Sequence, residues 1–190
     1  VASDTRGAVS ASVYPALVSK EHPLASVHGS FNAVFVKAQA ADDLMFYGRG
    51  AGGAPTASAV VGDIVGAARN IARGCNDASV PMYNAKSLAS TRSIRADFVV
   101  RCSMEDTSLA LCSEVMDVFA EHGVNAERLP MLCQTQYDGE GDCPACGIGG
   151  PGDLRVLVKD CTEADLSAIL ADLQKVDAVC AKPLALRIIE

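Results

Sequence analysis

The sequence contains no tryptophan, and aromatic residues make up only 5% of its 190 residues. Surfaces that stack nucleic-acid bases on aromatic rings are therefore not expected. Acidic residues outnumber basic residues by 23 to 16, and the net charge of −7 disfavours nucleic acids and anionic membrane surfaces. No apolar run reaches the roughly 18 residues that a transmembrane helix requires. We expect neither a nucleic acid nor a membrane as a partner.

Hydrophobic residues account for 49% of the chain, an ordinary fraction for a globular protein. A chain of 190 residues is long enough to form one large domain or two small ones. Intrinsic disorder is therefore not expected. The change of pattern after residue 74 favours a division into two domains.

Eight cysteines are scattered along a chain that is too long to be a small disulfide-rich scaffold. Several fall on apolar faces, where a thiol acts as a small hydrophobic group, so we expect a cytoplasmic protein. The close pair Cys143 and Cys146 lies in the glycine-rich stretch 135–152. No second pair completes a zinc site, and no strand-to-helix turn frames the pair for redox chemistry. We expect ordinary thiols in a flexible loop, with a metal or redox role as the alternative.

No constellation of catalytic or metal-binding side chains stands out elsewhere. The histidines, His22, His28 and His122, are far apart and lack partners at metal-ligand spacing, so no metal site is predicted. No Gly-x-Ser-x-Gly elbow or Cys/His pairing supports hydrolase chemistry. We assign no catalytic residue.

The first part of the chain, residues 1–74, has strand-like segments followed by one helix. Strands are predicted at 9–18, 31–37 and 44–47, and Pro55 suits the first turn of the helix that follows. Apolar residues recur there at helical spacing and predict a buried stripe, with Gly74 as the stop signal. The stripe consists of Ala57, Val60, Val61, Ile64, Val65, Ala68, Ile71 and Ala72.

A glycine-rich run stands between the last of these strands and the helix. It matches the dinucleotide fingerprint as Gly48-x-Gly50-x-x-Gly53, and a helix start suits an anion. A Rossmann unit also needs an acidic residue about 20 positions later, at the end of a second strand. Asp63 comes too early, and Asp77 lies in a polar stretch. The run is therefore not expected to open a Rossmann domain, and both a tight turn under a helix and a phosphate contact remain open.

The rest of the chain has a different pattern. Residues 75–96 lack a firm period and are predicted to be a linker. From residue 97 onwards the pattern predicts strand, helix, strand, strand, helix, strand, which is the split ferredoxin-like arrangement. The predicted elements are strands at 97–103, 124–133, 154–159 and 183–189, a helix capped by Asp106 or Thr107 and ending at Gly123, and a helix opened by a capping box at Thr162-Glu-Ala-Asp165.

The two helices of this second part are expected to turn one apolar stripe each toward the sheet. The stripes consist of Leu109, Cys112, Val115, Met116 and Phe119 in the first helix and Leu166, Ile169, Leu170 and Leu173 in the second. The predicted fold class is therefore α+β. A mixed sheet-and-helix segment at 1–74 precedes a βαββαβ domain at 97–190.

Four segments of the first part resemble the closing part of the catalytic region of homoserine dehydrogenase. They are Pro15-Ala-Leu-Val18, His22-Pro-Leu-Ala25, Gly29-Ser-Phe-Asn-Ala-Val34 and Gly48–Asp63. Bacterial members of that family often continue into an ACT domain, a βαββαβ amino-acid-sensing module, which fits residues 97–190. The resemblance covers nearly the whole chain. It rests on motifs in the first half and mainly on architecture in the second.

The resemblance implies an oxidoreductase that uses NAD or NADP to interconvert L-homoserine and L-aspartate 4-semialdehyde. Such an enzyme serves threonine, methionine and isoleucine synthesis. The glycine loop would pack beside a cofactor held by a separate N-terminal Rossmann domain, with Gly52 as the closest contact and Gly50 and Ala51 adjacent. Residues 1–47 would belong to the sheet that pairs subunits, and a homo-oligomer is expected.

The family's Rossmann unit, its catalytic lysine and the acidic residues that hold the substrate have no counterpart in this sequence. Lys20 and Lys37 lie beside strands or turns and are poor substitutes for the lysine. We expect the chain to be the C-terminal portion of a longer polypeptide and to be inactive alone.

ACT-type effector modules usually carry Asp-x-Pro-Gly between their first strand and helix, which leaves N–H groups open to a ligand. This chain keeps Asp106 but has Thr107 and Ser108 in place of Pro-Gly. The resemblance implies L-threonine as an effector at these three residues, although a side chain now stands where bare backbone would meet it. A simple helix cap at Asp106 is the alternative.

A second function of a different class is also open. The chain could act as a non-catalytic module for amino-acid binding and oligomerisation. The glycine run favours the dehydrogenase, because a pure sensor has no need of residues 48–53.

Overall fold

The computed structural model describes residues 2–5, 8–74, 86–130 and 152–189. The chain divides into two compact units. The first combines Val1–Leu17 with Lys86–Ile189, and the second is Val18–Ala85. This division differs from the predicted ranges 1–74, 75–96 and 97–190, because residues 1–17 group with the C-terminal part of the chain.

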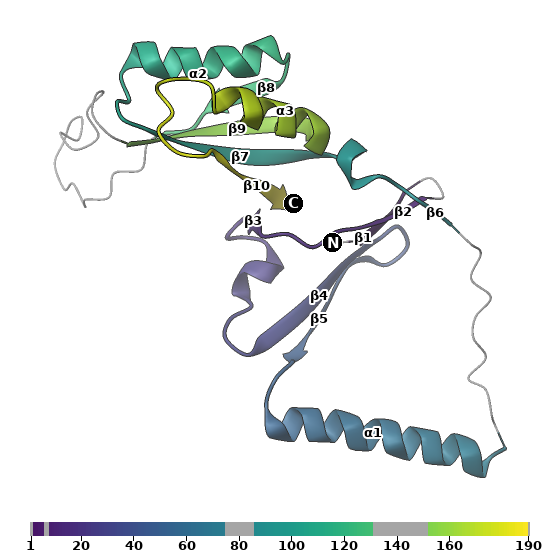
Figure 1. The fold of residues 1–190 in the computed structure, drawn as a ribbon. Coiled ribbons are helices and arrows are strands. Elements are labelled where there is room, and N and C mark those ends of the chain that lie inside the picture. Colours follow the sequence, from purple (N-terminus) through teal and green to yellow (C-terminus); the bar gives the residue numbers. More distant parts are fainter. Residues whose placement is uncertain (1, 6–7, 75–85, 131–151, 190) are drawn as a thin grey trace. The chain divides into compact units, whose positions relative to one another are not determined.

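The first unit contains a five-stranded sheet in the order β3-β10-β7-β9-β8. The strands are β3 (Ala16–Val18), β7 (Arg95–Met104), β8 (Asn125–Arg128), β9 (Gly152–Thr162) and β10 (Leu184–Ile189). Strand β7 pairs antiparallel with both β9 and β10, and β8 pairs antiparallel with β9. Helices α2 (Leu109–Glu121) and α3 (Glu163–Leu173) cover one face of the sheet (Figure 1). From β7 to β10 the elements follow the predicted βαββαβ order.

The core of this unit lies between the sheet and the two helices, as the alternation of β7 and β9 predicts. Its largest fully buried side chains are Phe119, Met104, Leu154, Ile169, Leu173, Val100, Val115, Val156, Val158, Cys102, Cys112 and Cys161. Leu109 is the exception among the predicted helix positions: it is the first residue of α2 and stays 62% exposed. The helical stripe therefore enters the core only at the next turn, at Cys112.

Three of the described cysteines act as small core residues, as predicted. Cys102, Cys112 and Cys161 are buried free thiols, whereas Cys180 is exposed. Burial raises the pKa of Cys102 to about 11, so its thiolate is not formed at neutral pH. The pair Cys143 and Cys146 lies outside the described residues.

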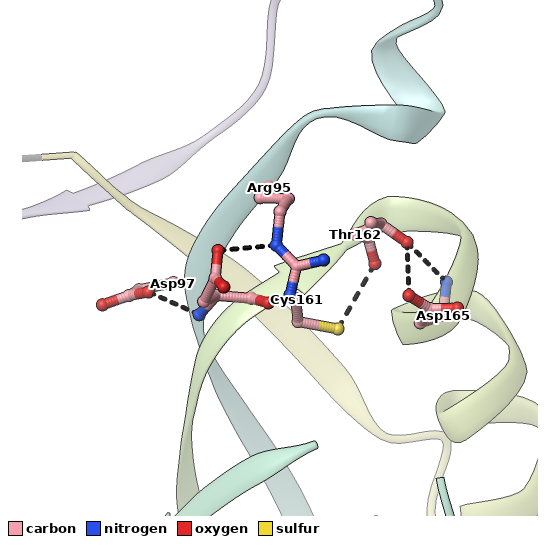
Figure 2. Close-up of polar contacts among 6 residues, drawn as sticks. Arg95, Asp97, Cys161, Thr162 and Asp165 are labelled. Carbon is pink, nitrogen blue, oxygen red and sulfur yellow. Dashed lines mark hydrogen bonds and ion pairs between the residues drawn. The ribbon is translucent and has the colours of Figure 1, made fainter. Parts of the chain in front are cut away.

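The two helices begin differently. The predicted start of α3 at Thr162 is confirmed: Thr162 Oγ1 accepts the Asp165 N–H at 3.1 Å and donates to Asp165 Oδ2 at 2.7 Å (Figure 2). Helix α2 is capped by Ser108 rather than by Asp106 or Thr107. Asp106 Oδ1 instead accepts the Ser108 N–H at 3.0 Å, which fixes the turn just before the helix.

A bulge interrupts the pairing of β7 with β9 between Ala96 and Phe98. Asp160 has a left-handed backbone with φ of 49°, and its N–H donates to Asp97 Oδ1 at 2.8 Å. Arg95 Nε donates to Asp160 Oδ1 at 2.7 Å (Figure 2). These side chains stabilise the bulge, so β7 begins two residues before the predicted position at 97.

A small second sheet explains why the first unit has two chain segments. Strand β2 (Ala8–Ala11) pairs antiparallel with β1 (Ala2–Thr5) and parallel with β6 (Ser87–Leu88). The predicted linker therefore contains strand β6 and the 3₁₀ turn η2 (Thr91–Ser93). The single strand predicted at 9–18 is instead two strands, β2 and β3, separated by residues 12–15.

The second unit consists of the 3₁₀ turn η1 (Pro23–Ser26), strands β4 (Phe31–Ala38) and β5 (Asp42–Arg49), and helix α1 (Gly53–Ala72). The two strands form an antiparallel hairpin, and Gly74 follows the helix with φ of 67°. The predicted helix is confirmed, but the predicted burial of its stripe is wrong in this chain. Exposed fractions of Val60, Val61, Ile64 and Ile71 lie between 51% and 72%.

We expect Leu173→Ala to lower the free energy of unfolding by about 2–5 kcal/mol, because it opens a cavity in a fully buried site. Leu109→Ala makes the same chemical change at the exposed start of α2 and should cost less than about 1 kcal/mol. Chemical denaturation of both variants, followed by circular dichroism, measures the difference. Equal losses would contradict the placement of the core.

Candidate functional site

The glycine-rich run joins the hairpin of the second unit to α1. Gly48 and Arg49 end β5, and Gly50 follows the strand. Ala51 and Gly52 form a bend, and Gly52 is the N-cap of the helix. The Gly50 N–H donates to the Ser30 carbonyl at 3.3 Å, so the bend stays attached to the hairpin.

Two of these glycines are explained by the structure of the second unit itself. Gly52 has φ of 124°, a backbone conformation that side-chain-bearing residues rarely adopt. A Cβ on Gly50 would lie 1.5 Å from Asn32 Nδ2, so any larger residue must displace that side chain. The tight-turn interpretation therefore accounts for both glycines, and a ligand is not needed to explain them.

The start of α1 nevertheless leaves room and donors for an anion. Gly52 provides no capping side chain, and a Cβ on Gly53 would meet nothing within 4 Å. Within the described part of the chain, no hydrogen bond joins the N–H groups of Gly53 and Ala54 to an acceptor. No acidic residue stands in the first turn, so the positive end of the helix dipole is not neutralised. This arrangement can accept a phosphate.

The predicted effector loop lies in the first unit, after β7. Thr107 is only 2% exposed, and a Cβ on Gly152 would come within 3.1 Å of its Cγ2. The Thr107 side chain therefore packs inward against the start of β9 rather than outward at the helix start. The Ser108 N–H already donates to Asp106 Oδ1, so Asp106 stabilises the turn before the helix, and Ser108 rather than Asp106 is the N-cap.

A polar cluster that the sequence pattern did not single out stands beside this loop. Asp153 accepts from Ser103 Oγ at 2.8 Å and pairs with Arg101 Nε at 2.8 Å. Burial alone would raise the pKa of Asp153, but the hydrogen bonds from Arg101 and Ser103 together lower it. Ser103 pairs directly with Asp153, and Arg101, which pairs with Arg155, lies two residues before Ser103 on the same face of β7. Their shared position on one face of the sheet is the sequence signal that could have identified the cluster.

The other side chains considered from the sequence do not form a site. His22 Nδ1 accepts the Leu24 N–H, and His122 Nε2 lies 2.9 Å from Asp172 Oδ2. Among the described residues, no group of three or more His, Cys, Asp or Glu side chains could hold a metal ion. Lys20 and Lys37 are exposed. Within the described ranges, no helix has the length and apolar character needed to cross a bilayer.

Comparison with known proteins gives a consistent relationship. The family model described as homoserine dehydrogenase matches residues 1–65. The chain is 45% identical over 120 residues to the homoserine dehydrogenase of Corynebacterium glutamicum, covering 63% of this chain and 27% of that protein. It is 39% identical over 178 residues to that of Mycobacterium leprae, covering 94% of this chain and 38% of the relative. The chain thus spans well under half of the length of these relatives.

The fold of this chain is also similar to that of a solved homoserine dehydrogenase. The crystal structure of a homoserine dehydrogenase from Thiobacillus denitrificans matches with a TM-score of 0.77 and 22% identity. The match covers 100% of this chain and 41% of the other. At this identity the likeness concerns the fold alone. The family model and the curated relatives are thus similar to this chain in sequence, and the solved structure is similar to it in fold.

Asp153→Asn should reduce stability at about pH 7, because the ionised carboxylate accepts from Arg101 and Ser103. The pKa of Asp153 is depressed in the folded state, so its contribution is present above the unfolded-state pKa of about 3.9 and is lost as the pH falls through the folded pKa. The difference between wild type and variant should therefore shrink toward about pH 3. Urea unfolding at several pH values measures it. A difference independent of pH would contradict the ionised pair.

Proposed function

We propose that this chain is the part of a homoserine dehydrogenase in which the end of the catalytic region continues into an ACT-type amino-acid-sensing domain. The alignment with the Mycobacterium leprae enzyme along nearly the whole chain carries this proposal. The βαββαβ order of residues 95–189 supports the second half, since this is the arrangement of an ACT domain. A cytoplasmic location is proposed on the same basis.

The reaction proposed for the whole protein is the interconversion of L-homoserine and L-aspartate 4-semialdehyde. Bound NAD or NADP supplies the hydride acceptor or donor in that reaction. The described part of this chain contributes no catalytic residue to the proposal. Its role is to shape one side of the cofactor site and to carry regulation.

The proposed contact with the cofactor is the glycine run, at Gly50, Ala51 and Gly52. The unbonded N–H groups of Gly53 and Ala54 and the helix dipole favour a phosphate there. The absence of side chains at the helix start lets the backbone approach the phosphate closely. Because Gly50 and Gly52 also have structural reasons, the N–H groups support the proposal more strongly than the glycines do.

L-threonine is the proposed effector, bound at the loop Asp106, Thr107 and Ser108. The inward Thr107 side chain supports this proposal, because it leaves the outer side of the helix start free of the bulk that the sequence predicted. Because the Ser108 N–H already donates to Asp106, that N–H group is not counted among the donors proposed for the effector.

We also propose a homo-oligomer. Strands β8 and β3 are the two edges of the five-stranded sheet, and sheet edges favour pairing between copies.

A chimera tests the enzyme proposal. We expect the Mycobacterium leprae enzyme, with its aligned region replaced by this chain, to oxidise L-homoserine with formation of NADH or NADPH, followed by absorbance. The unchanged Mycobacterium leprae enzyme is the control. A chimera that folds and binds a dinucleotide but does not oxidise homoserine would contradict the proposal. It would favour the alternative of a non-catalytic module for amino-acid binding and oligomerisation.

Within an active chimera, Gly53→Ala should weaken cofactor binding several-fold, because a methyl group would enter the space at the helix start. Gly62→Ala is the matched control, since a Cβ at either position meets nothing within 4 Å in the unit. Both changes should slightly stabilise α1, by up to about 1 kcal/mol. Fluorescence titration with NADH and NADPH measures affinity, and equal affinities in the two variants would exclude the contact.

For the effector, calorimetry of the 190-residue chain with millimolar L-threonine should give saturable heat. Asp106→Ala should abolish the heat, whereas Asp117→Ala, a change on the exposed side of α2, should not. Circular dichroism checks that both variants fold. No heat from the wild-type chain would remove the threonine proposal.

A further inference from the structure

Arg187 is an unusual side chain for a strand that faces a hydrophobic core. It lies on β10 directly opposite Phe98 of β7, and only 8% of it is exposed. Paired residues on antiparallel strands point to the same face, so Arg187 shares the helix-covered face with Phe98. Its Nη1 donates to the Tyr14 hydroxyl at 3.1 Å and lies 3.7 Å from Glu163 Oε1.

The other side of this guanidinium faces no partner among the residues that the structure describes. Nε and Nη2 of Arg187 are buried and form no hydrogen bond with any of those residues. A buried donor without an acceptor is costly, and the cost is larger for a charged group. The Nε–H and Nη2–H bonds of an arginine run parallel, which is the spacing that the two oxygens of a carboxylate match.

Two aromatic rings flank the Arg187 guanidinium. The Tyr14 ring lies 4.9 Å from the Arg187 guanidinium carbon, and the Phe98 ring lies 5.5 Å from it. Phe98 belongs to the rigid sheet, whereas Tyr14 lies in residues 12–15, which form no helix or strand. Tyr14 is only half-buried and is not one of the core residues of the sheet and helices.

The charges nearby also permit an anion. Within the described ranges, Glu163 is the one carboxylate paired with Arg187, and the pair is formed through Nη1 rather than through Nε or Nη2. Glu163 is also the first residue of α3, so the positive end of that helix dipole lies near the site. A second carboxylate therefore meets two positive influences and satisfies both free N–H groups.

We propose that Nε and Nη2 of Arg187 form a binding site for a small carboxylate, with Tyr14 as its movable cover. The site is separate from the loop at Asp106, because Phe98 lies near the start of β7 and that loop follows its end. The inference is independent of the proposed dehydrogenase activity.

The test uses acetate as the probe and the whole 190-residue chain at about pH 7, where acetate is ionised. We expect the melting temperature to rise saturably with acetate and not with chloride at equal ionic strength. Arg187→Lys keeps the charge but loses the parallel donors, and should weaken acetate binding about tenfold or more. Arg101→Lys, a half-exposed arginine on β7, is the matched control and should bind acetate normally.

Two results would overturn the proposal: no difference between acetate and chloride, or equal acetate binding by wild type and Arg187→Lys. Tyr14→Ala keeps the proposal testable if the lysine variant does not fold. This change uncovers Arg187 without altering it, so acetate should bind faster, as measured by relaxation of a ¹³C-acetate NMR signal. An unchanged rate would exclude Tyr14 as the cover.

Discussion

The strict alternation of β7 is the constraint on which the first unit depends. Phe98, Val100, Cys102 and Met104 are all buried on one face, beneath α2 and α3. Because β7 is bonded on both sides, to β9 and to β10, this parity also decides which residues of those strands face the helices. It places Arg187 inside, opposite Phe98, and it places Arg101 and Ser103 together with Asp153 on the other face.

The glycine run illustrates how a motif can have structural reasons that are separate from a proposed ligand contact. Gly52 is required by its backbone angle and Gly50 by the neighbouring Asn32. The features that favour a phosphate are different ones, namely the free N–H groups and the uncapped helix dipole. A glycine pattern is therefore weak evidence for a ligand. The N–H groups at the helix start, for which the described residues provide no acceptor, are stronger evidence.

Local features of the fold were predictable because their causes are local. The helical and strand periods of residues 97–190 predicted the core, and Thr162 with Asp165 predicted the start of α3. Contacts between distant segments were not predictable in this way. No pattern near residue 8 indicates parallel pairing with Ser87, and no pattern near residue 187 indicates that an arginine is buried there. The apolar stripe of α1 correctly predicted a helix. It could not indicate whether other residues of this chain pack against the stripe and bury it.

The pairing of β3 with β10 has a consequence for synthesis of the protein. The sheet joins residues 16–18 to residues 184–189, so β3 cannot pair with β10 until residues 184–189 have been synthesised. The intervening segment, including α1 with its apolar side exposed, is complete long before that sheet can close. Contacts so distant in sequence slow folding. The closing of this sheet is therefore a late step in folding, because it requires strands that are far apart in the sequence.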